Sequence, residues 1–203
     1  MWQRTKAVED LACVCDAVGD LLAAVRPEQW TAPTPCTEWN VHDVVNHLVA
    51  VNLAFAAWVA HGPKPVEGAD HLGDDPVGAY RTSAAGLLAV LASSEVLERD
   101  HPGPARGATG AQRLQLRVVD LLTHGWDLAQ ATGIAIQISD ETGAQALAFV
   151  QDQLSPRFRA FAGFAEPQPV SAAAPAIERL AAFSGRSVEA GYTDILSATV
   201  SDR

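Results

Sequence analysis

Hydrophobic residues recur at three- and four-residue intervals over most of the chain, which is the spacing of one face of an α-helix. In residues 4–25 this stripe consists of Val8, Leu11, Ala12, Cys15, Val18, Leu22 and Val25. Similar stripes predict further helices over residues 41–59, 77–93, 112–132, 139–154 and 175–183. Residues 134–138 alternate as a strand does, but so short a segment cannot form a sheet alone.

Polar residues and glycine mark the ends of these helices. Asn40 and Ser139 stand where N-caps are expected, and Asp43 places negative charge in the first turn of its helix. Gly133 suits the left-handed turn that follows a helix. The segments between the helices, 26–39, 61–76 and 99–112, are rich in turn-forming residues. Four long amphipathic helices joined by such loops favour an all-α four-helix bundle with additional short C-terminal helices.

Length and composition predict a single domain over residues 1–203, because 48% hydrophobic residues suffice for a sizeable core. The chain has 14 Lys and Arg against 24 Asp and Glu, and a net charge of −10 repels nucleic acid. No apolar run stands out as a membrane span, and charges interrupt the N-terminus where a signal peptide is apolar. We therefore expect a soluble, cytoplasmic protein that binds neither nucleic acid nor a membrane.

The three cysteines, Cys13, Cys15 and Cys36, match no zinc or redox spacing and are expected to be reduced, small buried residues. Four of the six histidines stand in loops or at a helix start, where solvent can satisfy them: His42, His61, His71 and His101. His47 instead lies mid-helix within an apolar run, where a hydrogen-bonded core histidine is the commoner interpretation.

Asp120 and His124 make a metal-ligand role for His47 more favourable. They are four residues apart, so both side chains leave the same face of one helix among apolar neighbours. A surface Asp–His pair would explain the spacing, but a desolvated carboxylate needs a partner. Facing helices of a bundle can supply one, and His47, Asp120 and His124 would offer two nitrogens and one carboxylate to a metal ion with a coordination position left open.

Two further carboxylates lie near these residues. Asp43 is one turn before His47, where capping is its expected role and support of a metal ligand the alternative. Asp127 follows His124 by three residues, so it can orient that histidine, although a solvated helix-end carboxylate is the favoured interpretation. Neither residue, nor His42, is identified as a general base except by nearness.

Three sequence segments carry a family resemblance: WTAPTPCTEWNVHDVVNHLVAVN (30–52), DLLTHGWDLAQATG (120–133) and FAEPQPVSAAAPAIERLAAFSGR (164–186). Together they resemble the DinB-like metal-binding superfamily, in the branch related to the N-terminal domain of mycothiol-dependent maleylpyruvate isomerase. The resemblance implies a divalent ion, usually zinc, on His47, Asp120 and His124. The isomerase has glutamate in place of Asp120, so nickel, iron or manganese stay open as alternatives.

Characterised members of this family are thiol-dependent isomerases and transferases, and related proteins often form homodimers. The resemblance thus implies a metal-dependent enzyme that acts on a small-molecule electrophile with mycothiol or a similar thiol. The alternative is a non-catalytic metal-binding bundle used for ligand sensing or protein interaction. A fourth protein ligand would favour that module, and an open position beside an apolar pocket would favour the enzyme. A metal-free Asp–His contact is the third interpretation.

Overall fold

The computed structural model describes residues 2–93, 110–153, 159 and 163–188. These residues form six α-helices: α1 (Trp2–Ala23), α2 (Val41–Ala60), α3 (Pro76–Ser93), α4 (Gly110–Thr132), α5 (Asp140–Gln153) and α7 (Ala176–Phe183). A short 3-10 turn, Pro27–Gln29, lies between α1 and α2. The described residues contain no strand, and residues 134–138 take no regular form. The all-α prediction is confirmed. His101 and most of loop 99–112 lie outside the described residues.

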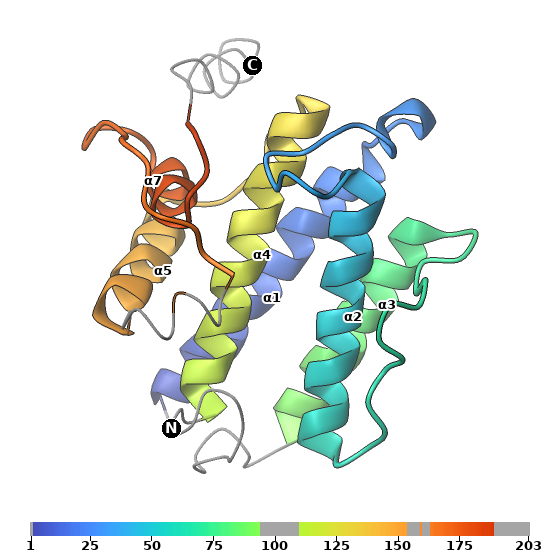
Figure 1. The fold of residues 1–203 in the computed structure, drawn as a ribbon. Coiled ribbons are helices and arrows are strands. Elements are labelled where there is room, and N and C mark those ends of the chain that lie inside the picture. Colours follow the sequence, from blue (N-terminus) through green and yellow to red (C-terminus); the bar gives the residue numbers. More distant parts are fainter. Residues whose placement is uncertain (1, 94–109, 154–158, 160–162, 189–203) are drawn as a thin grey trace, which may run out of the picture.

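The first four helices form a ring in which each helix packs against two others (Figure 1). Helix α1 contacts α3 and α4, and α2 contacts the same two helices from the other side, with far fewer contacts to α4 than to α3. Helices α2 and α3 run in the same direction, because residues 61–75 return along the outside of the bundle (Figure 1). The Asn46 side chain holds this return by donating to the Ala69 carbonyl at 3.0 Å and accepting from the His71 amide at 2.8 Å.

The predicted helix ends are confirmed. Asn40 and Asp43 form a reciprocal capping box, in which each side chain accepts a hydrogen bond from the other residue's backbone N–H. The Ser139 hydroxyl accepts from the Thr142 amide at 3.1 Å. Gly133 ends α4 with a φ of 70°, a conformation that L-residues other than glycine adopt at a cost. These local devices place α2 and α4 at defined registers, which matters because both carry site residues.

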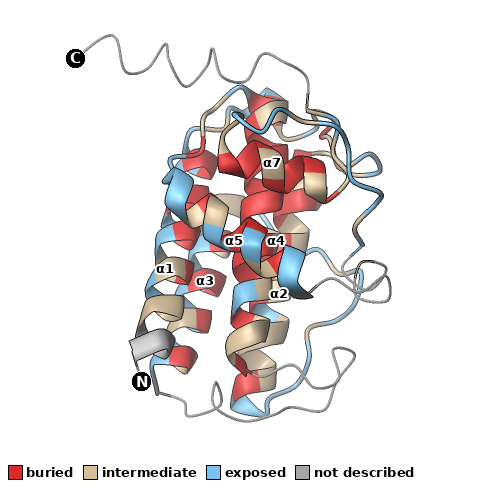
Figure 2. Ribbon diagram, turned by 90° about the vertical axis from the view of Figure 1, so that its left-hand side faces the viewer, coloured by how far each residue is buried: buried red, intermediate tan, exposed pale blue. Residues whose placement is uncertain are grey.

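Helix α4 is buried on more than one side, since α5 and α7 cover the flank that faces away from α2 and α3 (Figure 2). Its buried residues include Leu121, Leu122, Trp126 and Leu128. Gly125 leaves room for the Ile136 side chain, because a Cβ there would lie 2.6 Å from Ile136 Cδ1.

Helix α2 corrects the expectation that no apolar run in the sequence stands out as a membrane span. By length and composition it is apolar enough to cross a membrane, and among the described residues it is the one helix of that kind. The helix is this apolar because Asp43 is its one Asp, Glu, Lys or Arg residue. In this structure α2 packs against α3 and α4, and its Asn52 is fully buried in hydrogen bonds with neighbouring helices. A core helix of a bundle can have the same composition.

Replacing the N-cap of α2 should destabilise the protein measurably. The Asn40→Ala variant loses the hydrogen bond that the Asn40 side chain accepts from the Asp43 N–H, and we expect the free energy of unfolding to fall by about 1 kcal/mol. Urea denaturation of the metal-free protein measures this difference. Thr31→Ala, an exposed position in the same connector, is the matched control. Equal midpoints for the two variants would show that the cap contributes nothing.

Candidate metal centre

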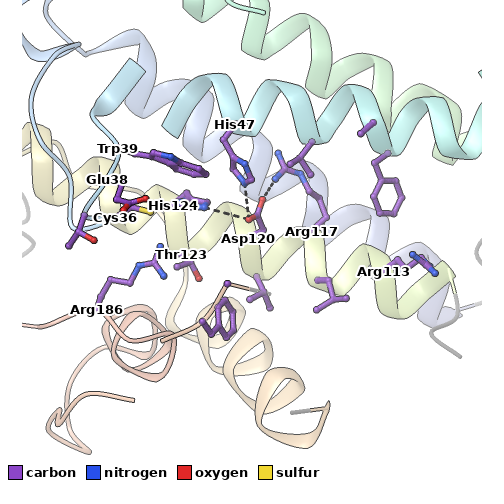
Figure 3. A pocket seen from close by; sticks show the side chains of 18 of the residues that line it. Cys36, Glu38, Trp39, His47, Arg113, Arg117, Asp120, Thr123, His124 and Arg186 are labelled. Carbon is purple, nitrogen blue, oxygen red and sulfur yellow. Dashed lines mark hydrogen bonds and ion pairs between the residues drawn. The ribbon is translucent and has the colours of Figure 1, made fainter. Parts of the chain in front are cut away.

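The three predicted ligands converge between α2 and α4. His47 comes from α2, Asp120 and His124 come from α4, and one potential ligand atom of each lies within 4.8 Å of the others. Asp120 Oδ1 is 3.3 Å from His47 Nε2 and 3.6 Å from His124 Nε2. The three side chains face one another across the gap between the helices (Figure 3). As predicted, the i, i+4 spacing places Asp120 and His124 on the same face of α4. Helix α2, on the opposite side, supplies His47.

Arg117 holds the second oxygen of the Asp120 carboxylate. Arg117 is 2% exposed, and its guanidinium donates to Asp120 Oδ2 from Nη1. Its other N–H groups donate to Asn52 Oδ1 at 2.8 and 3.1 Å and to the Leu48 carbonyl at 2.9 Å, both on α2. Asp120 therefore keeps Oδ1 toward the two histidines, and it can bind an ion there through one oxygen.

Asp127 fixes the orientation and tautomer of His124. Its Oδ2 lies 3.0 Å from His124 Nδ1 and 2.9 Å from Arg186 Nη2, while Oδ1 accepts from Arg186 Nε at 3.2 Å. An ionised carboxylate can only accept, so Nδ1 carries the ring proton and Nε2 presents its lone pair toward Asp120. This carboxylate–histidine arrangement is typical of metal-binding histidines.

The favoured interpretation of Asp127 as a solvated helix-end carboxylate is therefore wrong. Its side chain has no exposed surface, because the segment after α7 folds back and places Arg186 against it. The three-residue spacing from His124 made the orienting role possible. Nothing in the sequence indicated that an arginine 59 positions later would cover the carboxylate.

Charged and hydrogen-bonding neighbours determine the ionisation of Asp120 and Asp127. Burial alone would raise the pKa of Asp120, but the His47 hydrogen bond and the Arg117 charge outweigh it and hold the pKa well below its ordinary value. For Asp127, burial is likewise outweighed by hydrogen bonds from His124 and Arg186, so its pKa is also lowered. Both groups are thus anionic at neutral pH and offer acceptors to cationic or N–H partners.

The cysteines differ from the expectation of three small buried residues. Cys15 is buried as predicted, but Cys13 is exposed and Cys36 is half-buried beside the site. Cys36, His124 and Asp127 form a second group of potential ligand atoms within 4.8 Å. That group is the poorer metal site, because His124 Nδ1 and both Asp127 oxygens are engaged in hydrogen bonds. Burial also raises the pKa of the Cys36 thiol, although the Arg186 charge opposes this.

A cavity of about 770 Å³ opens from the three residues. Trp39 lies against its histidines, with ring centroids 4.8 Å from His47 and 5.6 Å from His124. At this end the wall also includes Cys36, Thr123 and Arg186, and at the other end it is largely apolar (Figure 3). The cavity therefore joins a polar corner to a hydrophobic chamber large enough for a small molecule.

Several residues of the site had no signal in the sequence. In the sequence, nothing distinguishes Arg117 and Arg186 from arginines that lie on a protein surface. Thr123 likewise gives no signal in the sequence. In the structure it is 2% exposed, and its hydroxyl has no hydrogen-bond partner among the described residues. Asp43, by contrast, caps α2 as expected. Of the other described histidines, His42, His61 and His71 do not belong to the residues that line this cavity.

The model of the mycothiol maleylpyruvate isomerase N-terminal domain family matches residues 11–129. The chain belongs to this family. The match includes His47, Asp120, His124 and Asp127, and it ends before Arg186. The resemblance to the DinB-like branch that the sequence motifs indicated is confirmed, and the bundle has the helical architecture expected of that branch.

Two curated relatives cover most of the chain. Both are uncharacterised proteins of Mycobacterium tuberculosis, one from strain CDC 1551 / Oshkosh and one from strain ATCC 25618 / H37Rv. Each is 34% identical over 174 residues, which is 85% of this chain and 93% of the relative. The match thus extends past the family domain into the C-terminal part. No solved structure was found to match.

The Asp127–Arg186 pair should make stability depend on acidity. A lowered pKa in the folded state contributes stability above the ordinary value of 3.8, and that stability is lost as the pH falls through the folded-state pKa. At neutral pH, Asp127→Asn leaves Arg186 buried without its counter-charge, so we expect the free energy of unfolding to fall by about 3–5 kcal/mol. Below a pH of about 4, the difference in the free energy of unfolding between Asp127→Asn and wild type should become smaller.

Urea denaturation at a series of pH values, with chelator present, measures this dependence. Asp20→Asn is the matched control, since Asp20 pairs with Arg81 at 3.1 Å on the surface and its loss should cost at most about 1 kcal/mol. A constant difference between Asp127→Asn and wild type down to strongly acidic pH would contradict the assignment.

Proposed function

We propose that this protein is a metal-dependent transferase or isomerase that activates a low-molecular-weight thiol, such as mycothiol, for reaction with a small electrophile. One observation carries the proposal: two imidazoles and a carboxylate, oriented by buried partners, converge at the wall of a cavity of about 770 Å³. The family's name connects its domain to mycothiol and to an isomerase. Free cysteines at positions 13, 15 and 36 agree with a reducing, cytoplasmic setting.

The donor set fits a divalent ion. Two imidazole nitrogens and one carboxylate oxygen form a ligand set that zinc accepts in catalytic sites, and nickel, iron and manganese accept it as well. His124 is already in the tautomer that a ligand needs, because Asp127 accepts its Nδ1 proton. Among the described residues three ligands converge in this group, which favours an enzyme with an open position over a non-catalytic module with four protein ligands.

A divalent cation at this point lowers the pKa of a coordinating thiol, so that a thiolate is present near neutral pH. The protein's own groups prepare the surroundings. Trp39 covers the two histidines and restricts water around them. Thr123 lines the same corner, and its buried hydroxyl has no hydrogen-bond partner among the described residues. Arg117 restrains Asp120 so that Asp120 Oδ1 keeps facing the histidines.

Metal content tests the ligand assignment. Protein purified without chelator should carry about one divalent ion per chain, measured by elemental analysis. His124→Ala should lose most of it, because one of three protein ligands is removed. His61→Asn is the control, since His61 is an exposed C-cap with a φ of 55° that asparagine tolerates. Equal metal content in the two variants would move the site elsewhere.

Thiol chemistry tests the activity. Zinc-loaded protein should accelerate the conjugation of mycothiol with chlorodinitrobenzene, followed by absorbance, and chelator should abolish the effect until zinc is restored. His47→Ala should lower the rate by at least about tenfold, whereas His61→Asn should not change it. An acceleration that survives complete removal of metal would refute a metal-dependent mechanism.

A further inference from the structure

The cavity at the candidate metal centre has two ends of different polarity. At one end, Thr37 and Glu38 are exposed to solvent and stand beside Cys36. In Figure 3 Glu38 and Cys36 lie close to His124, and Arg113 lies at the opposite end of the row of labelled side chains. A molecule bound at the Glu38 end can therefore keep its polar groups in contact with water.

The other end of the cavity is lined by a stripe of α2 that begins one turn after His47. Its residues follow one another at three- and four-residue steps, and all of them are half-buried: Val51, Ala54, Phe55 and Trp58. The face of α2 that packs into the core is fully buried instead, as in Val44, Val45 and Leu48. The stripe thus leaves apolar surface toward the cavity, and we call this part the apolar end.

Ala54 has the smallest side chain of the stripe. Beyond it, Phe55 and Trp58 pack edge to face with ring centroids 5.1 Å apart, and the guanidinium carbon of Arg113 lies 5.2 Å from the Trp58 ring centroid. Ala54 follows His47 by seven residues, which is about 10 Å along the helix axis. The small side chain therefore leaves room at the depth that a short alkyl chain or an aromatic ring would reach from the histidines.

The two reactants of the proposed reaction differ in polarity in the same way as the two ends of the cavity. A low-molecular-weight thiol such as mycothiol carries many hydroxyl and amide groups, which cost free energy when they are buried without hydrogen-bond partners. An apolar wall supplies no such partners, but burial of an alkyl or aromatic group against it is favourable. The thiol therefore fits the polar end, and the electrophile fits the apolar end.

We propose that the apolar end, lined by Val51, Ala54, Phe55 and Trp58, binds the apolar body of the electrophile, and that Ala54 determines how long this body can be. This inference rests on the proposed function and names its substrate class. The preferred electrophiles carry a neutral alkyl or aromatic group on the reactive carbon, which faces the histidines while the apolar group points away from them.

Binding to the apolar end is measured in zinc-loaded protein with N-phenyl-1-naphthylamine, a neutral probe whose fluorescence increases in apolar surroundings. Butanol, hexanol and octanol are then used to displace the probe. The affinity should rise by about threefold to fourfold for each added methylene, because each one is transferred from water to an apolar wall. Equal affinities for butanol and octanol in wild-type protein would refute an apolar subsite.

Ala54→Leu places a branched side chain in the space that the alkyl chain would occupy. It should weaken the binding of octanol by at least about tenfold and leave the affinity for butanol within about twofold of wild type. Ala60→Leu is the matched control, because Ala60 is exposed on the same helix and lies outside the described residues that line the cavity. Equal octanol affinities in the two variants would show that the apolar body lies elsewhere.

A homologous series of terminal epoxides, from epoxybutane to epoxyoctane, tests the reaction with mycothiol. The thiolate sulfur forms a bond with the terminal carbon as the bond from that carbon to oxygen breaks, and the oxygen takes up a proton from water. In wild-type protein kcat/KM should increase by at least about tenfold from the shortest to the longest epoxide. Ala54→Leu should remove this increase and leave kcat/KM for epoxybutane within about twofold of wild type.

Failure of the subsite and failure of the proposed function give different results. If chlorodinitrobenzene reacts with mycothiol but the epoxides do not, or if their rates are independent of chain length, the electrophile subsite is wrong and the metal-dependent activity stands. If the alcohols bind as expected but neither the epoxides nor chlorodinitrobenzene reacts with mycothiol, the proposed function is wrong. The assignment of the apolar end to an electrophile is then wrong with it.

Discussion

The burial of the Arg117 guanidinium between α2 and α4 is the constraint on which the site depends. A buried cation is stable only when its N–H groups are matched by acceptors, and here Asn52, the Leu48 carbonyl and Asp120 supply them. Two of these acceptors lie on α2 and the third on α4. The cation therefore fixes how the two helices lie relative to each other, although α2 packs much less against α4 than against α3.

From Arg117 a series of polar contacts crosses the molecule. Asn52 donates to the Ser83 hydroxyl of α3 at 3.1 Å, Asp120 meets the two histidines, and His124 leads to Asp127 and Arg186. Each charged member faces a member of opposite charge or a strong dipole. Removing one member leaves its partner buried and unmatched, which is why such networks specify geometry more than they add stability. The histidine nitrogens point at one place as a result.

The apolar part of the cavity exists because α2 and α4 stand apart. Where α2 and α4 stand apart, Phe55 and Trp58 fill only part of the gap, and a chamber remains beside the polar group. A fully packed bundle would have closed it, because interiors are otherwise dense. The combination of oriented candidate ligands with an unfilled apolar space distinguishes this region from a structural ion-pair network.

The sequence by itself determined the helices, their caps and the three side chains that meet. Periodicity fixed the faces of α2 and α4, and Asn40, Ser139 and Gly133 fixed their ends or those of their neighbours, because these effects act over a few residues. The tertiary structure alone decided the roles of Arg117, Asp127, Cys36 and Arg186. Their hydrogen-bond partners lie up to 69 residues away in the chain, and burial, which gives each charge its strength, exists only once distant segments pack together.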